Sequence, residues 1–245
     1  MLELLKPVKT DSLKEICVAR LEELILSGTL KSGDKLPPER DLAQQLGVSR
    51  PVVHEALVDL AAKGLVSIVP RVGTVVNDYT REGSLALLTS LINYRQGALD
   101  PRLLNGLLRM RELFETENAR QAAANRTLDQ METFYRIIFE ESETGSEDID
   151  RLVNLDFEFH LQVALATGIL LYPMMLNSFK PVYTNISRIF FTDSHVTDTV
   201  LALHRELVSA ISDRDEVQAE QAMRRLLLHG ETWVKTNLSR QGGLP

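Results

Sequence analysis

The stretch that decides the fold runs from residue 33 to residue 76 and reads GDKLPPERDLAQQLGVSRPVVHEALVDLAAKGLVSIVPRVGTVV. Its proline pair and acidic first turn suit a helix start, so we expect a helix from about Pro38 to Leu46. Gly47 can take the left-handed conformation that ends this helix in a sharp turn. Ser49 then serves as the N-cap of a second helix, which makes the segment a helix-turn-helix.

The second helix and the segment after it complete the pattern. Its apolar residues recur at helical spacing and face inward, while Arg50 and His54 point away. After Gly64, the segments LVSIV and GTVV are rich in β-branched residues and flank a turn at residues 70–73, which predicts a hairpin, or wing. Such a second helix contacts the major groove of DNA with its N-terminus, and a basic wing tip reaches the minor groove or the backbone.

An amphipathic helix is expected upstream and would cover the back of the helix pair, because apolar residues recur there at helical spacing. These residues are Leu13, Ile16, Leu21, Leu24 and Ile25. The DNA-binding domain accordingly extends over residues 1–78. Residues 79–83 are polar and lack periodicity, which predicts a short linker that can transmit a change of shape to the DNA-binding domain.

The order of helices and wing resembles the GntR family of bacterial transcription regulators from about Ser12 to Val76. The phrases SGTLKSGDKLPPERDLA and LGVSRPVVHEAL carry the resemblance. In that family the arginine of the LPxER phrase and the arginine after the serine cap contact DNA, which implies these roles for Arg40 and Arg50. A third basic residue follows four positions later, and His54 replaces the usual arginine there. With the wing turn included, the candidate DNA contacts are Arg40, Ser49, Arg50, His54, Arg71 and Gly73.

Because the chain is not basic overall, any positive charge that binds DNA must be concentrated in one region of its surface. The chain has a formal net charge of −7, and its first 78 residues contain nearly equal numbers of basic and acidic side chains. Positive charge must therefore gather on one face of the first domain. A single cysteine, Cys17, excludes an intramolecular disulfide framework. With no signal peptide and no apolar run of transmembrane length, we expect a cytoplasmic protein.

Beyond the linker, residues 84–240 are predicted to form an all-helical domain. The expected helices span residues 84–95, 101–125, 128–145, 148–167, 171–192, 197–213 and 215–237. Short connections between them indicate an antiparallel bundle. The expected fold is thus an α+β winged helix-turn-helix followed by an all-α bundle that binds an effector and dimerises.

Polar residues occupy core-facing positions on three of these helices. Asp156 and His160 lie one turn apart on one helix, and His204 and His229 lie on the inward stripes of the last two helices. A buried carboxylate is costly unless it is paired or bound to a metal, and this combination is typical of a divalent metal site inside a bundle. The alternative is an internal ion pair between Asp156 and an arginine, with the histidines as hydrogen-bonded core residues.

From about Leu99 to Trp233 the chain resembles the helical effector domain of the fatty-acid-regulator branch of GntR proteins, called FCD. The phrases RELFETENARQAA, DFEFH and LHRELVSAISDRD carry this resemblance. Many members hold a metal such as Zn, Ni or Mn with one Asp and three His, which implies ligand roles for Asp156, His160 and His204. The fourth position is Leu226, and His229 follows one turn later. Either His229 reaches the metal, or the site has three protein ligands, or it is empty.

The helix at residues 101–125 contains a candidate effector anchor. Arg111, Glu115 and Asn118 share its inward stripe, and an arginine can grip a carboxylate with two parallel hydrogen bonds. The resemblance implies an organic acid, sugar acid or fatty acyl effector near this arginine. The alternative is a structural pair between Arg111 and Glu115. In that case the anchor would lie on the helix with Thr184, Asn185 and Arg188.

The combined expectation is a homodimeric transcription regulator that binds a palindromic operator and is released by a small carboxylate effector, most simply as a repressor. No catalytic residues are assigned. The alternative is a helical metal-dependent enzyme acting on a small organic acid, which would need a general acid or base beside the metal. The nearest spare carboxylate, Glu158, is two residues from Asp156 and should face away from the core.

Overall fold

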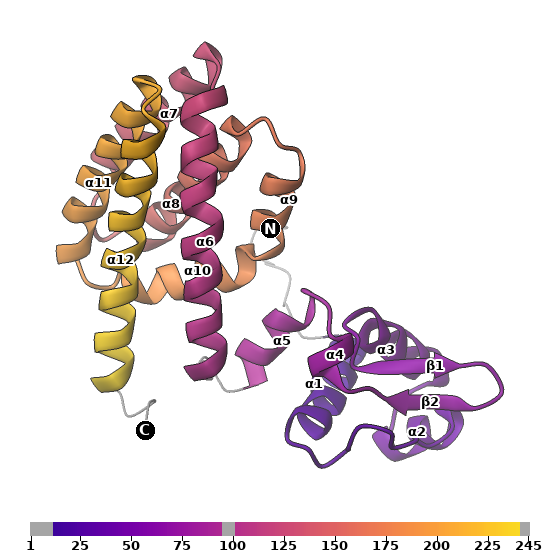
Figure 1. Ribbon diagram of the computed structural model, residues 1–245. Helices are drawn as coiled ribbons and strands as arrows, with labels where there is room; N and C mark the ends of the chain where they lie inside the picture. The colour runs from indigo at the N-terminus through magenta and orange to yellow at the C-terminus, as the bar shows by residue number, and fades with distance from the viewer. Residues whose placement is uncertain (1–11, 95–100, 241–245) are drawn as a thin grey trace, which may run out of the picture. The chain divides into compact units, whose positions relative to one another are not determined.

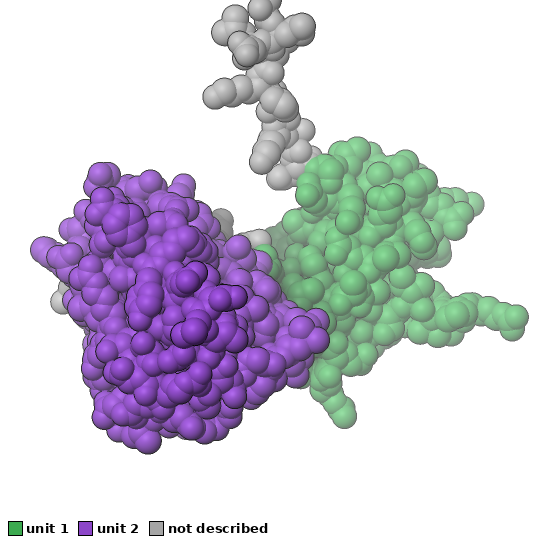
Figure 2. Space-filling model, turned by 90° about the horizontal axis from the view of Figure 1, so that it is seen from above, with its two compact units in different colours: residues 1–97 green, residues 98–245 purple. Residues whose placement is uncertain are grey.

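The computed structural model describes residues 12–94 and 101–240 (Figure 1). Contacts between Cα atoms divide the chain into two compact units, residues 1–97 and residues 98–245, which Figure 2 shows in different colours. None of the helices in the described residues combines the length and the apolar character needed to cross a bilayer.

The first unit has the expected order of helix, helix-turn-helix and wing. Its elements are α1 (Leu13–Leu26), α2 (Glu39–Leu46), α3 (Arg50–Ala62), β1 (Val66–Val69), β2 (Gly73–Val76), α4 (Tyr79–Glu82) and α5 (Leu87–Tyr94). Gly47 ends α2 with a φ of 68°, and Ser49 is the N-cap residue of α3. The wing is a two-stranded antiparallel sheet in which Val66 faces Val76 and Val69 faces Gly73. The predicted winged helix-turn-helix is therefore confirmed.

The buried face of α1 differs from the one we expected. Leu13 and Ile16 are 58% and 53% exposed, whereas Cys17 and Val18 are buried against α3 together with Leu21. In the first turn, Lys14 meets α3 through its ion pair with Asp59, and Leu13 and Ile16 lie off that face. The small Cys17 side chain thus takes a core position that the sequence pattern had given to larger residues.

The segment predicted to be a linker is ordered against α3. The side chains of Asn77 and Ser84 bond to the carbonyls of Gly64 and Ala62, at 3.1 Å and 2.9 Å. Downstream, Leu87 is 3% exposed in the same core as α1. The compact units divide at Gly97 rather than at residues 79–83, and the helix expected at 84–95 belongs to the first unit. Asn77 and Ser84, which flank the predicted linker, thus bond the backbone at the end of α3, and α4 forms between them.

The second unit is a helical bundle. Its elements are α6 (Pro101–Asn125), α7 (Leu128–Glu143), α8 (Ile149–Ala166), α9 (Leu171–Ser178), α10 (Lys180–Phe190), α11 (His195–Ser212) and α12 (Glu216–Arg240). The two longest helices, α6 and α12, lie side by side (Figure 1). They run in opposite directions, because Arg120 pairs with Glu216 near one end and Glu112 pairs with Arg224 further along.

The helix expected at 171–192 is broken into α9 and α10. Phe179 ends α9 and begins α10, and Pro181 lies in the first turn of α10. A proline lacks the N–H that a continuous helix would need there, so the chain starts a new helix instead. The break turns Tyr183 and Ser187 toward α8, where Asp156 lies.

Two glycines of the first unit should respond differently to alanine. Gly47 and Gly64 both have positive φ, at 68° and 78°, but a Cβ on Gly64 would lie 2.0 Å from the Glu82 carbonyl oxygen, whereas one on Gly47 would meet nothing within 4 Å. Gly47→Ala should cost about 1 kcal/mol of stability from the left-handed backbone alone. Gly64→Ala should cost at least about 2 kcal/mol more, because the backbone must move as well. Urea denaturation followed by circular dichroism measures both, and equal losses would contradict the packing of α4 on α3.

Candidate nucleic-acid interface and effector cavity

The candidate DNA contacts lie at the start of α3 and along α2. The side chains of Arg40, Arg50 and His54 are 90%, 71% and 56% exposed. Ser49 caps α3 through its extended backbone conformation, and its side chain makes no capping hydrogen bond, which leaves the hydroxyl available. A helix N-terminus with exposed donors is suited to phosphate and base contacts.

A single carboxylate organises this face. Glu39 accepts from Arg50 Nε at 2.9 Å through one oxygen and lies 2.8 Å from His54 Nδ1 through the other. The hydrogen bond from His54, followed by that from Arg50, lowers the pKa of Glu39. Glu39 thus fixes both side chains in position. The sequence had indicated it only as first-turn charge for α2, because the angle between α2 and α3 that brings it to Arg50 is not visible in the spacing.

The wing tip presents the other two candidates. Arg71 has a φ of 63° and is exposed at the turn between β1 and β2, and Gly73 follows with a φ of 112°. A Cβ on Gly73 would lie 3.0 Å from Lys35 Cε, and Lys35 pairs with Val75 beside the wing. The wing therefore offers Arg71 at its tip and Lys35 at its side.

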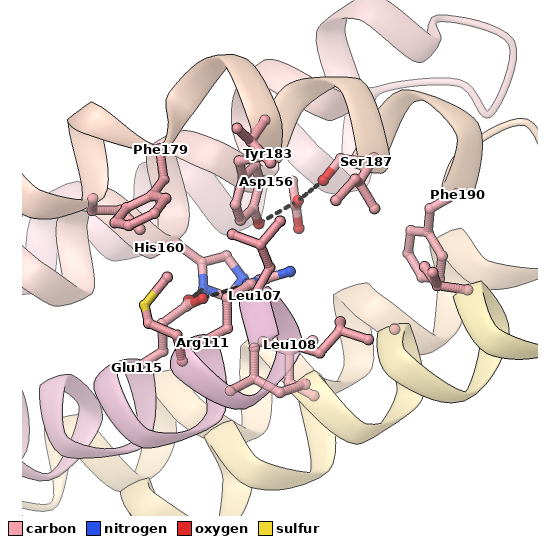
Figure 3. Close-up of a pocket in the computed structure, with 18 of the residues that line it drawn as sticks. Leu107, Leu108, Arg111, Glu115, Asp156, His160, Phe179, Tyr183, Ser187 and Phe190 are labelled. Carbon is pink, nitrogen blue, oxygen red and sulfur yellow. Dashed lines mark hydrogen bonds and ion pairs between the residues drawn. The ribbon is translucent and has the colours of Figure 1, made fainter. Parts of the chain in front are cut away.

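The second unit has a cavity lined by α6, α8, α10 and α12, with a volume of about 70 Å³ behind an open mouth (Figure 3). Its polar residues are Arg111, Glu115, Asp156, His160, Tyr183 and Ser187. The rest of the lining is apolar: Leu107, Leu108, Met110, Phe114, Leu176, Phe179, Val182, Ile186, Phe190, Val200, Leu226, Leu227, Gly230 and Val234. The polar side chains gather in one part of the cavity, and Phe190 lies apart from them (Figure 3).

Arg111 and Glu115 form a pair within this lining, as their spacing suggested. Arg111 Nε donates to Glu115 Oε1 at 2.6 Å, and the guanidinium lies 4.6 Å from the centre of the Tyr183 ring. Burial raises the pKa of Glu115, but the Arg111 charge and the His160 ring beside it outweigh burial and hold that pKa at about 2. Burial likewise opposes the charge on Arg111, yet Glu115 beside it raises the arginine pKa. Both groups are therefore ionised at neutral pH.

The remaining anchor candidates lie outside the lining. Asn118 is 1% exposed on α6 but is not among the described residues that line the cavity. On α10, Arg188 pairs with Asp150 on the exposed side and Asn185 is exposed, so the alternative anchor faces away. The neighbouring residues on α10, Tyr183 and Ser187, face the cavity instead.

Three of the four predicted metal ligands come together. Asp156, His160 and His204 are all buried, and one potential ligand atom from each lies within 4.8 Å of the others. His204 Nε2 is 3.8 Å from Asp156 Oδ1. The other oxygen of Asp156 accepts from the Tyr183 hydroxyl at 2.6 Å and from Ser187 Oγ at 3.3 Å. The internal arginine pair that was the alternative for Asp156 is replaced by these two hydroxyl donors.

His229 is not part of this group of described residues. Leu226 lines the cavity at the fourth position, whereas His229 packs against Phe190, with 5.7 Å between ring centres. Three residues along a helix amount to about 4.5 Å, which carries the imidazole past the other ligands. Burial lowers the pKa of His229. The structure thus places His229 outside the group of three, and its role as a ligand stays a prediction.

Each of the two grouped histidines has a buried glutamate at Nδ1. His160 Nδ1 pairs with Glu115, and His204 Nδ1 lies 2.9 Å and 3.0 Å from the two oxygens of Glu141. Glu141 was missed in the sequence, although a glutamate at a core-facing position of α7, after Met131, Phe134 and Ile137, is the signal that could have found it. Glu158, by contrast, pairs with Arg136 and does not line the cavity.

Family models match both parts of the chain. The model of bacterial regulatory proteins of the gntR family matches residues 13–76, and the FadR C-terminal domain model matches residues 77–241. The chain belongs to the GntR family, with a FadR-type C-terminal domain. It is a DNA-binding transcriptional regulator of the GntR/FadR type, and its family and named relatives are regulators of transcription.

Relatives and structures agree with this assignment. The chain is 31% identical to the HTH-type transcriptional regulator Mce2R of Mycobacterium tuberculosis over 91% of this chain and 92% of that one. It is 26% identical to the fatty acid metabolism regulator protein of Yersinia enterocolitica over 91% and 90%. Among solved structures, the Listeria monocytogenes regulator Lar is similar with a TM-score of 0.61 and 18% identity, covering 94% of this chain and 99% of that one. At that identity the structural likeness supports the GntR fold alone.

The hydroxyl bonds to Asp156 yield a stability prediction. Tyr183→Phe should lower the free energy of unfolding by about 1.5 to 3 kcal/mol, because a buried carboxylate loses its shorter hydrogen bond. Tyr135→Phe is the matched control, since its hydroxyl lies 3.3 Å from Ser212 Oγ at the surface. The control should change stability by less than about 0.5 kcal/mol. Urea denaturation compares the two variants, and similar losses would show that the bond to Asp156 contributes nothing beyond a surface contact.

Proposed function

We propose that this GntR-family regulator is a homodimeric repressor that binds a palindromic operator and releases it when an acyl effector enters the cavity of the bundle. The observation that supports this effector class is the lining of the cavity. One part holds Arg111 and further polar groups, and the rest is apolar. A carboxylate or acyl thioester with a hydrocarbon chain matches this division, whereas a sugar acid would leave its hydroxyl groups without partners.

Arg111 is the proposed anchor for the polar end of the effector. Among the described residues, its guanidinium makes one hydrogen bond, from Nε to Glu115, so further N–H groups remain for a ligand. The half-buried position strengthens such a bond. The relatives named fatty acid metabolism regulator protein, in Yersinia enterocolitica and other bacteria, support the same class of effector.

We also propose that Asp156, His160 and His204 hold one divalent cation, such as Zn²⁺, Ni²⁺ or Mn²⁺, through three protein ligands. Among the described residues, His204 Nε2 is buried and has no hydrogen-bond partner, which is the fit that a metal requires. The net charge of the buried side chains around this site also favours a divalent cation. With neutral imidazoles, the carboxylates of Glu115, Glu141 and Asp156 exceed the single guanidinium of Arg111 by two negative charges, and a divalent cation balances them.

Regulation requires the effector to favour one arrangement of the DNA-binding units over another. A hundredfold loss of operator affinity corresponds to about 2.7 kcal/mol of coupling free energy. One or two charge-assisted hydrogen bonds to Arg111, together with burial of a hydrocarbon chain, can supply this amount.

DNA binding should depend on Arg50. Arg50→Ala should cost about 1 to 3 kcal/mol of binding to an operator selected from random DNA with the unaltered protein, because a base-contacting side chain is lost. Arg20→Ala is the matched control, since Arg20 is 59% exposed on α1 and pairs with Glu23. Fluorescence anisotropy at several salt concentrations measures both, and affinity should fall steeply with salt. Unchanged affinity of Arg50→Ala would overturn the proposed docking of α3.

The response to effector should depend on Arg111. We expect oleate or oleoyl-CoA to release the protein from its operator. The double variant Arg111→Gln, Glu115→Gln avoids an unpaired buried charge and should bind the operator normally yet lose this release. Arg109→Gln is the control, because Arg109 is exposed on the same helix and pairs with Glu112. Release of the double variant at the same ligand concentration would refute the anchor, and a wild-type protein that ignores both ligands would refute the acyl class.

A further inference from the structure

The surroundings of His204 fix the orientation of its ring. The imidazole is 0% exposed and stacks on Phe159, with 3.7 Å between ring centres and 13° between planes. Its Nδ1 edge faces both oxygens of Glu141, and its Nε2 edge faces Asp156. A ring that stacks on one face and bonds at Nδ1 has a single orientation, which directs the unpartnered Nε2 at Asp156.

The hydrogen-bond geometry determines where the Nδ1 proton lies. A carboxylate has no hydrogen to donate, so His204 Nδ1 must be the donor to Glu141 at 2.9 Å. In the neutral ring, Nε2 then presents a lone pair to Asp156 Oδ1. Two acceptors facing each other in a buried site need a cation between them.

The distance between these two acceptors favours a metal over a proton. His204 Nε2 and Asp156 Oδ1 are 3.8 Å apart, which is longer than the roughly 2.7 to 3.2 Å of a hydrogen bond. Two ligand atoms at about 2.1 Å from one ion lie roughly 3.0 to 4.2 Å apart, according to the coordination angle. The observed separation falls within this range.

We propose that Glu141 is a positioning residue for metal binding: it holds the Nδ1 proton of His204 and thereby presents Nε2 to a divalent cation shared with Asp156 and His160. Glu115 Oε2 lies against Nδ1 of His160 as an ion-pair partner, but these two atoms make no hydrogen bond among the described residues. The inference rests on the proposed metal site and adds to it a residue that orients one of its ligands. A carboxylate behind a ligating histidine also increases the basicity of the ligand.

Substitution of Glu141 tests the positioning role more directly than substitution of Glu115. Glu115 is shared with Arg111, whereas His204 is the one side chain that the Glu141 carboxylate bonds among the described residues. Glu141 is 7% exposed and lies on the core face of α7, where its neighbours are Met131, Phe134 and Ile137. A buried carboxylate with no arginine or lysine beside it in the described structure is costly. Orienting a metal ligand is a role that accounts for it.

The test is titration of the untagged protein with Zn²⁺ and Ni²⁺ by isothermal calorimetry after chelator treatment. The unaltered protein should bind about one ion per chain, and Glu141→Gln should bind it roughly 10 to 100 times more weakly. Glu143→Gln is the matched control on the same helix, because Glu143 is exposed, and it should bind as the unaltered protein does. Nitrogen-15 spectra of the metal-free proteins should show the Nδ1-protonated tautomer of His204 in the unaltered protein and a mixture of tautomers in Glu141→Gln.

Each outcome decides a different point. Equal affinity of Glu141→Gln and the unaltered protein would overturn the positioning role while leaving the metal site intact. No binding by the unaltered protein and by Glu143→Gln would overturn the metal site itself. If Glu141→Gln does not fold, Glu141→Asp keeps the charge but withdraws it by one methylene, and it should still weaken binding at least severalfold. Undiminished affinity in that variant would count against the proposal in the same way.

Discussion

The bundle depends on one electrostatic constraint, which is that ionised carboxylates inside an apolar core need positive charge within reach. Glu115, Glu141 and Asp156 are at most 7% exposed. Arg111 supplies one positive charge, and the two histidines direct nitrogen atoms at all three carboxylates. Of this group, Arg111, Glu115, Asp156 and His160 line the polar part of the cavity. The same charges that must be balanced for the bundle to fold are thus the ones that a metal and an effector headgroup would meet.

An acid also positions the candidate DNA contacts of the first unit. Glu39 fixes Arg50 and His54 on the face that we propose contacts DNA, in the way that Glu115 pairs with Arg111 in the cavity. Held side chains lose less conformational entropy on binding, which favours a specific complex over a diffuse one. The net negative charge of the chain is consistent with this arrangement, because the acids are what position the cations.

Local signals in the sequence predicted most helices and strands. They did not predict which side chains of neighbouring helices contact one another. Gly47 and the β-branched wing segments fix the helix-turn-helix through backbone preferences, and helical periodicity placed Asp156, His160 and His204 toward one interior. Periodicity cannot show which side chain of a neighbouring helix faces a given residue. Glu141 therefore escaped notice. The break before Pro181 was missed because the apolar pattern continues through it, and it is this break that orients the hydroxyl donors toward Asp156.

The most direct test of the charge balance is anomalous diffraction from crystals of the protein grown with Zn²⁺, recorded on both sides of the zinc absorption edge. One peak per chain is expected, in contact with Asp156, His160 and His204, with Glu141 still bonded to Nδ1 of His204. The proposed metal site would be contradicted by crystals that show no peak between these side chains and in which both imidazoles carry a second proton. Two protons would then supply the charge that we assign to the metal.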